Sequence, residues 1–156
     1  NYEGDRCDVY TTDASGLAST RSALPDPGAH MVLPEIISKE PLGPATRHGD
    51  DQWADIARWT LNALINAEEL GVTSANVDAL AKGSDNPEIN RMLGSEGSLA
   101  EQLGLSKDWA VNAIKAEGNY SEIFERYLGP DTALALERGL NALWSDGGIL
   151  YAPPMR

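Results

Sequence analysis

The chain has 156 residues, of which 42% are hydrophobic, and this is enough for one ordinary domain with its own core. Its 24 Asp and Glu residues outnumber its 12 Lys and Arg residues and give a net charge of -12, which disfavours nucleic acids and anionic membrane surfaces as partners. No apolar run approaches the roughly 20 residues that a spanning helix needs, so we expect no membrane crossing.

The first forty or so residues combine extended segments with one short helix. Residues 8–12 are rich in β-branched and aromatic side chains and predict a short strand. Small and apolar residues at helical spacing predict a helix over 14–24, which the Pro-Asp-Pro-Gly run at 25–28 would end. Further extended stretches are predicted at 31–38 and 43–47. Prolines in this region cannot donate to a β-ladder, which indicates edge strands or crossings between lobes.

From residue 50 onward the sequence is typical of helices. The clearest helix begins after Asp50 or Asp51, either of which can cap it, and ends before Gly71. Its predicted buried face follows the i, i+3, i+4 rhythm and comprises Trp53, Ile56, Ala57, Thr60, Leu61, Leu64 and Ile65. Shorter helices follow, and their predicted polar starts are Ser74, Asn86, Ser106 and Asn119.

The C-terminal part predicts one more helix and an extended tail. Asp131 or Thr132 would start the helix, and the tail would cover residues 149–156. The apolar residues of this predicted helix are Leu136, Leu140, Leu143 and Trp144. Two or three strands without hairpin turns cannot form an independent sheet, so we expect their partner strands to lie upstream of this sequence.

Asp13 is the strongest candidate for a ligand-binding residue. It directly follows the predicted strand at 8–12, and the carboxyl ends of strands are where open α/β sheets place ligand groups. A carboxylate there can accept charge-assisted hydrogen bonds from a substrate ammonium group. An Asp at this position can equally cap the following helix, and the two roles do not exclude each other.

Catalytic and metal-binding patterns are weak. Ser15 lacks the glycine two residues earlier that a nucleophile elbow requires. Residues 48–51 include metal-capable side chains, but they fall where a helix cap is expected and have no second His or Cys at ligand spacing. Cys7 is the single cysteine, so it is either a free thiol or half of a bridge to a residue outside the sequence. We expect no catalysis, no metal ion and no cofactor.

Several segments resemble the polar amino-acid-binding family of type II periplasmic binding proteins, and in particular the general L-amino-acid-binding proteins of ABC transporters. The similarity runs essentially from end to end and corresponds to the C-terminal half of these proteins. The segments that carry the resemblance are 4–13, 7–17, 35–50 with 39–50 as its strongest part, 62–77, 138–144 and 151–154.

The resemblance implies an α/β fold, namely the C-terminal portion of a two-lobe binding protein, mostly helical with a few strands. Residues 1–38 would form the last part of lobe two, and 39–156 a crossing strand and the C-terminal part of lobe one. Residues from about 71 to 115 would be a helical insertion relative to shorter members. The implied hinge comprises Ser38, Lys39, Glu40, Pro41 and Leu42.

The resemblance also implies a function. Asp13 matches the carboxylate that pairs with the α-ammonium group of a bound L-amino acid, while the arginine that clamps the α-carboxylate matches the absent N-terminal half. The protein would capture amino acids of broad specificity in the periplasm, after a signal peptide upstream of this segment, and deliver them to a membrane permease. Cys7 would form a disulfide with a cysteine outside this chain.

Two alternatives remain open at this point. One is a stand-alone acidic helical interaction domain, which is indifferent to amino acids. The other is a dehydratase-like enzyme that reuses the binding fold, although the sequence offers no strong general acid. If the N-terminal half is absent, unpaired strand edges and apolar surface would be exposed, so we expect association with that half or with another copy of the chain.

Overall fold

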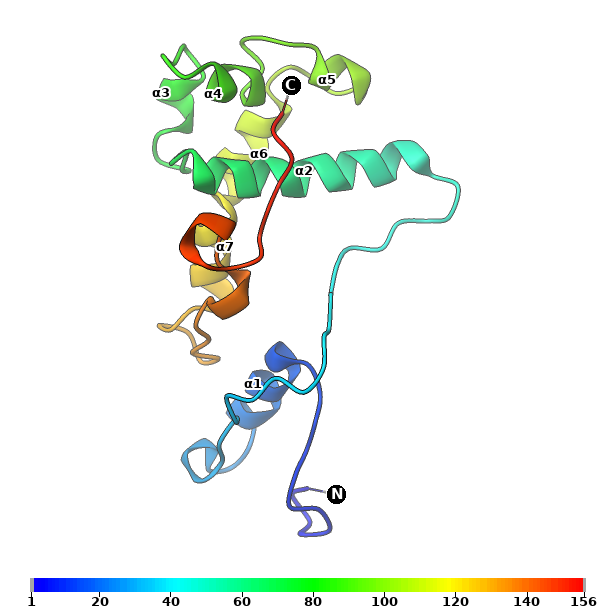
Figure 1. Ribbon diagram of the computed structural model, residues 1–156, viewed down its shortest axis with the longest axis vertical. Coiled ribbons are helices and arrows are strands. Elements are labelled where there is room, and N and C mark those ends of the chain that lie inside the picture. The colour runs from blue at the N-terminus through cyan, green and yellow to red at the C-terminus, as the bar shows by residue number, and fades with distance from the viewer. Residues whose placement is uncertain (1, 156) are drawn as a thin grey trace. The chain divides into compact units, whose positions relative to one another are not determined.

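The computed structural model describes residues 2–155 and forms two compact units (Figure 1). Unit 1 contains the described residues up to Gly43 together with Glu125–Glu137. Unit 2 contains Pro44–Phe124 together with the described residues from Arg138 onward. The division at residue 38 inferred from the resemblance concerns the lobes of a longer protein, and it stays a prediction.

The long helix α2, Asp51–Glu69, is the main element of unit 2 and confirms the helix predicted most clearly from the sequence. Its predicted buried face is wrong in part, because Trp53 and Leu61 are exposed and only Ile65 of that face is fully buried. The carboxylate of Asp50 accepts a hydrogen bond from the N–H of Trp53 at 3.1 Å and so caps the first turn. Gly71, two residues beyond the helix, has φ +68°, a left-handed conformation that favours glycine. Both ends of α2 are therefore determined by the local sequence.

Short helices follow α2, as predicted, and each is limited by its own polar start and glycine or turn. The bounds are α3 Val77–Leu80, α4 Pro87–Met92, α5 Leu99–Gln102, α6 Trp109–Glu117 and α7 Tyr120–Tyr127. The helix α5 was not predicted from the sequence. Asn86 caps α4 as expected, because its side-chain oxygen accepts from the N–H of Glu88 at 2.9 Å. That residues 71–115 are an insertion relative to shorter family members stays a prediction.

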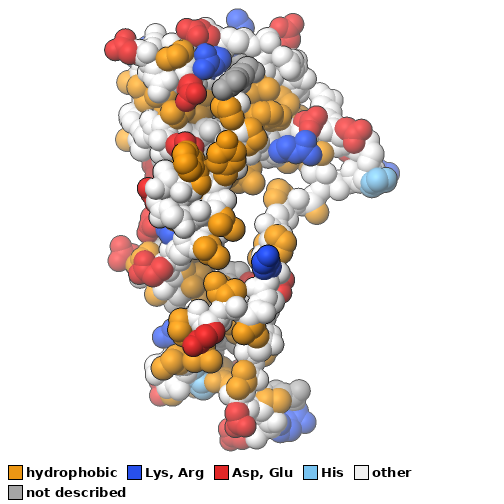
Figure 2. Space-filling model, in the orientation of Figure 1, with side chains coloured by type: hydrophobic (Ala, Val, Ile, Leu, Met, Phe, Trp, Pro, Cys, Tyr) orange, Lys and Arg blue, Asp and Glu red, His pale blue; other side chains and the backbone are white. Residues whose placement is uncertain are grey.

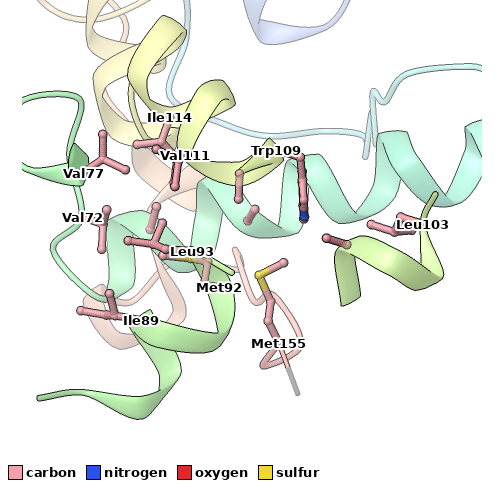
Figure 3. Packing of buried hydrophobic residues seen from close by; sticks show 14 residues of the cluster. Val72, Val77, Ile89, Met92, Leu93, Leu103, Trp109, Val111, Ile114 and Met155 are labelled. Carbon is pink, nitrogen blue, oxygen red and sulfur yellow. The ribbon is translucent and has the colours of Figure 1, made fainter. Parts of the chain in front are cut away.

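The core of unit 2 forms where α6 packs against α2, with side chains from the short helices around them (Figure 3). Burying a large apolar side chain of this kind stabilises a fold by about 1.5–3 kcal/mol. Met155, near the end of the chain, also points into this cluster. The buried members are Ala63, Ala67, Val72, Val77, Ile89, Met92, Leu93, Ala100, Leu103, Trp109, Ala110, Val111, Ile114 and Met155.

The predicted helix from residue 131 onward is wrong. Two short 3₁₀ turns, Gly139–Asn141 and Trp144–Asp146, occupy this region instead. Ala135 and Gly139 both have φ +49°, and a helix cannot pass through left-handed residues. The described residues from 149 form no helix and no strand beyond the bridge residue Leu150, and Arg156 lies outside them.

In unit 1 the helix α1, Ala14–Ser22, is present as predicted, but the strands are not. Residues 8–12 and 31–38 are irregular, with bends at residues 8, 34 and 38, and residues 43–47 at the start of unit 2 also form no strand among the described residues. A strand needs a neighbour to satisfy its backbone groups, and local preference alone does not supply one. Residues 2–155 contain one isolated bridge, between Leu143 and Leu150.

Large apolar side chains lie on the surface of both units, and hydrophobic groups are visible over much of the face in Figure 2. In unit 1 the exposed fraction reaches 81% for Ile37 and 79% for Met31. In unit 2 it is 70% for Ile149 and 67% for Tyr151. The described residues thus form small cores that leave much apolar surface uncovered.

Candidate functional site

Asp13 stands at the start of α1, and its two carboxylate oxygens have different partners. Oδ1 accepts a hydrogen bond from the N–H of Gly16 at 2.7 Å and another from the hydroxyl of Ser15 at 2.6 Å. The hydroxyl of Thr12 donates to Oδ2 over 3.3 Å, a longer and weaker contact. The capping role of Asp13 is confirmed, and its role in ligand binding stays a prediction.

The hydrogen bonds to Asp13 also stabilise the ionised form of its carboxylate. Its pKa lies below the ordinary value, first because the Ser15 hydroxyl donates to the carboxylate and second because the Gly16 N–H does. Asp13 is therefore an anion throughout the neutral range, held in one orientation at the surface of unit 1. A fixed carboxylate in which one oxygen accepts only a long hydrogen bond is a suitable acceptor for an ammonium group.

The five residues predicted as a hinge, 38–42, are all exposed. Within this segment the N–H of Leu42 donates to the carbonyl oxygen of Glu40 at 2.9 Å. The boundary between the two units falls directly after it, between Gly43 and Pro44. The hinge role itself stays a prediction.

Cys7 is exposed and unbridged in the part of the chain that the structure describes. A disulfide to a cysteine outside this sequence stays a prediction. Within residues 2–155, no group of three or more His, Cys, Asp or Glu side chains gathers in a way that could hold a metal ion. No helix in the same range has the length and apolar character needed to span a bilayer.

A second polar cluster, around Glu122, was not singled out from the sequence. Glu122 accepts hydrogen bonds from the hydroxyl of Ser74 at 2.6 Å and from the N–H of Asn119 at 2.8 Å. Asn119 in turn accepts from the N–H of Glu122 at 3.0 Å, which completes a capping box at the start of α7. The Asn-x-x-Glu spacing is the signal that could have identified it. These contacts join a helix start to a neighbouring loop, so we assign the cluster a structural role.

No family model matches this sequence, but individual proteins match it closely. A general L-amino-acid-binding periplasmic protein from Rhizobium johnstonii is 62% identical over 99% of the chain. A protein from Rhodobacter capsulatus that is named for binding glutamate, glutamine, aspartate and asparagine is 56% identical over 99% of the chain. The chain is a homologue of periplasmic amino-acid-binding proteins. The resemblance inferred from the sequence is confirmed.

A solved structure agrees with this homology. The periplasmic binding protein of an ABC transporter from Brucella ovis, with glutathione bound, is 55% identical and matches 99% of the chain with a TM-score of 0.92. The predicted fold, part of a periplasmic binding protein and mostly helical, is thereby confirmed. The present chain spans 46% of the length of both curated relatives and 49% of the solved chain, which is about half of each.

Proposed function

We propose that the complete protein containing this sequence is the substrate-binding component of an ABC importer. It captures L-amino acids in the periplasm with broad specificity and delivers them to the membrane permease. The close relatives that are named for amino-acid binding carry this proposal. These relatives are named as amino-acid-binding proteins, and others are named as ABC-transporter binding proteins, rather than as enzymes, which disfavours the dehydratase alternative.

Within this function Asp13 binds the α-ammonium group of the ligand. The carboxylate is charged and oriented before any ligand arrives, because Ser15 and Gly16 hold Oδ1. Oδ2 then accepts the ammonium without losing a strong internal hydrogen bond. Preorganisation of this kind lowers the free-energy cost of binding. The α-carboxylate of the ligand pairs with groups outside the present sequence, and binding then favours a closed form that the permease recognises.

The test is calorimetric titration of the complete protein with L-glutamate, L-glutamine and L-alanine, for the wild type and Asp13→Asn. The asparagine oxygen can still accept the capping hydrogen bonds, but its NH₂ group replaces the acceptor that faces the ammonium. We expect the affinity to fall by about 10- to 100-fold, because a hydrogen bond to a charged group contributes about 1.5–3 kcal/mol. The melting temperature should change little.

Asp26→Asn is the matched control, since Asp26 is an exposed carboxylate of unit 1 whose side chain caps nothing. Wild-type affinity in Asp13→Asn would contradict the role of Asp13. Absence of amino-acid binding by the wild type would remove the proposal and favour the stand-alone interaction domain.

A second class of ligand is suggested by the glutathione in the solved relative. The glutamyl residue of glutathione is linked through its γ-carboxyl group, so its α-ammonium and α-carboxylate are free, as they are in glutamate. We therefore propose that γ-glutamyl peptides compete for the same site. γ-Glutamylcysteine should displace glutamate, whereas α-glutamylcysteine, whose α-carboxyl is in an amide bond, should not. Equal competition by the two isomers would contradict this part of the proposal.

A further inference from the structure

The backbone conformation of Gly16, in the first turn of α1, does not require glycine. Its φ lies outside the left-handed region, so the conformation accepts any L-residue. Glycine also makes a helix less stable than alanine does. The geometry of the helix therefore does not explain why this position lacks a side chain.

Because Gly16 has no side chain, the space beside Oδ2 of Asp13 stays open. A Cβ atom on Gly16 would lie 2.9 Å from Oδ2 and 3.0 Å from the methyl carbon of Thr12. Oδ2 could not turn away from it freely, because Oδ1 is held by the N–H of Gly16 at 2.7 Å and by Ser15 at 2.6 Å. A methyl group here would thus crowd Oδ2 of Asp13, the oxygen to which we propose the ligand ammonium binds.

We propose that Gly16 is a positioning residue for the ligand ammonium. Its N–H orients the carboxylate of Asp13 through Oδ1, and its lack of a side chain keeps Oδ2 open. An ammonium nitrogen binds a carboxylate oxygen at about 2.7–2.9 Å, the same distance at which the added Cβ would sit. The added Cβ would occupy one side of Oδ2 and hinder an ammonium group that approaches from that side. This inference rests on the proposed function of Asp13.

The test is Gly16→Ala in the complete protein, titrated with L-glutamate and followed by thermal unfolding. We expect the Kd to rise by about 10-fold or more. The melting temperature should change little, because the crowding of the added Cβ against Asp13 and Thr12 offsets the gain in helix propensity. Gly28→Ala is the matched control in unit 1, since its added Cβ would meet its nearest atom, an oxygen of Asp26, at an ordinary contact distance of 3.5 Å. It should leave the Kd unchanged.

A double-mutant cycle with Asp13→Asn separates positioning from a general structural effect. If Gly16 acts through Oδ2, then Gly16→Ala should weaken binding much less in the Asp13→Asn background than in the wild type. Equal losses in both backgrounds would overturn the inference, and so would wild-type affinity in Gly16→Ala. In either case the function proposed for Asp13 would still stand if Asp13→Asn alone weakens binding. A wild type that binds no amino acid would overturn both.

Discussion

Asp13 combines two roles that a sequence pattern cannot separate. Its position after the segment 8–12, predicted as a strand, and at the start of a helix suits a cap and a ligand-binding carboxylate equally well. The structure assigns the cap to Oδ1 and leaves Oδ2 with one long contact, to Thr12 at 3.3 Å. The two roles are thus compatible because they use different oxygens.

The lowered pKa of Asp13 makes a prediction about acid stability. A group whose pKa is depressed in the folded state contributes stability above its unfolded pKa, and this contribution is lost as pH falls through the folded pKa. The wild type should therefore lose part of its stability below about pH 4, the ordinary range for Asp. Asp13→Asn should lack this part of the loss. Unfolding curves measured from neutral pH to about pH 2 check it, and identical pH profiles would contradict it.

The ion pair between Arg138 and Glu68 predicts a large mutational effect. The two side chains are 3.0 Å apart and are only 16% and 14% exposed. Arg138 also lies over the rings of Tyr120 and Phe124, at 5.3 and 5.2 Å from their centres. Arg138→Met leaves the Glu68 carboxylate without this partner, so we expect a loss of about 3 kcal/mol in urea unfolding.

The exposed pair of Lys115 and Asp78 is the control for Arg138. Its atoms are closer, at 2.6 Å, but the side chains are 57% and 59% exposed. Water screens such a pair, and Lys115→Met should cost less than about 1 kcal/mol. A larger loss from Lys115→Met than from Arg138→Met would contradict the argument that burial, and not distance, decides the effect.

At the scale of elements, the start of α7 depends on Glu122. Its carboxylate accepts from Ser74 and Asn119, so Glu122→Ala removes half of the capping box and a link to the loop before α3. We expect a loss of about 1–3 kcal/mol, measured by urea unfolding. Glu125→Ala, at an exposed position of the same helix, is the control and should cost little. Equal effects of the two variants would contradict the role of the box.

The same elements show how much the sequence could predict. The helix α2 was predictable because its apolar rhythm and both of its ends are local features. The helix expected from residue 131 had a similar rhythm, but the left-handed Ala135 and the turns after it depend on packing that a pattern does not contain. The prediction of strands was wrong for a different reason. Residues 8–12 have the composition of a strand, yet their ladder partners are not among residues 2–155.

The candidate site was predictable in part. Asp13 and its capping role followed from position and residue type. The division between its two oxygens, and the space that Gly16 leaves, depend on side-chain geometry that no spacing rule provides. The ligand role of Asp13 rested on its place after the segment predicted as a strand and on the resemblance, and neither supplies the side-chain geometry.

At the scale of the whole molecule, the uncovered apolar surface predicts association. Val9, Met31 and Ile37 of unit 1 are at least 70% exposed, as is Ile149 of unit 2. The chain also spans about half the length of its relatives. Expressed alone, residues 1–156 should pair with another copy, and a co-expressed N-terminal half should replace that copy. Light scattering checks this, and a compact monomer without a companion polypeptide would contradict it.

The buried side chain of Met155 has a consequence for biosynthesis. Every other member of the unit 2 core lies between residues 63 and 114, so a ribosome makes them first. The last member emerges about forty residues later, after the segment 125–137 that belongs to the other unit. Domains tend to fold in the order in which they are synthesised. This unit instead keeps one side of its core open until Met155 has packed against it, wherever the chain folds.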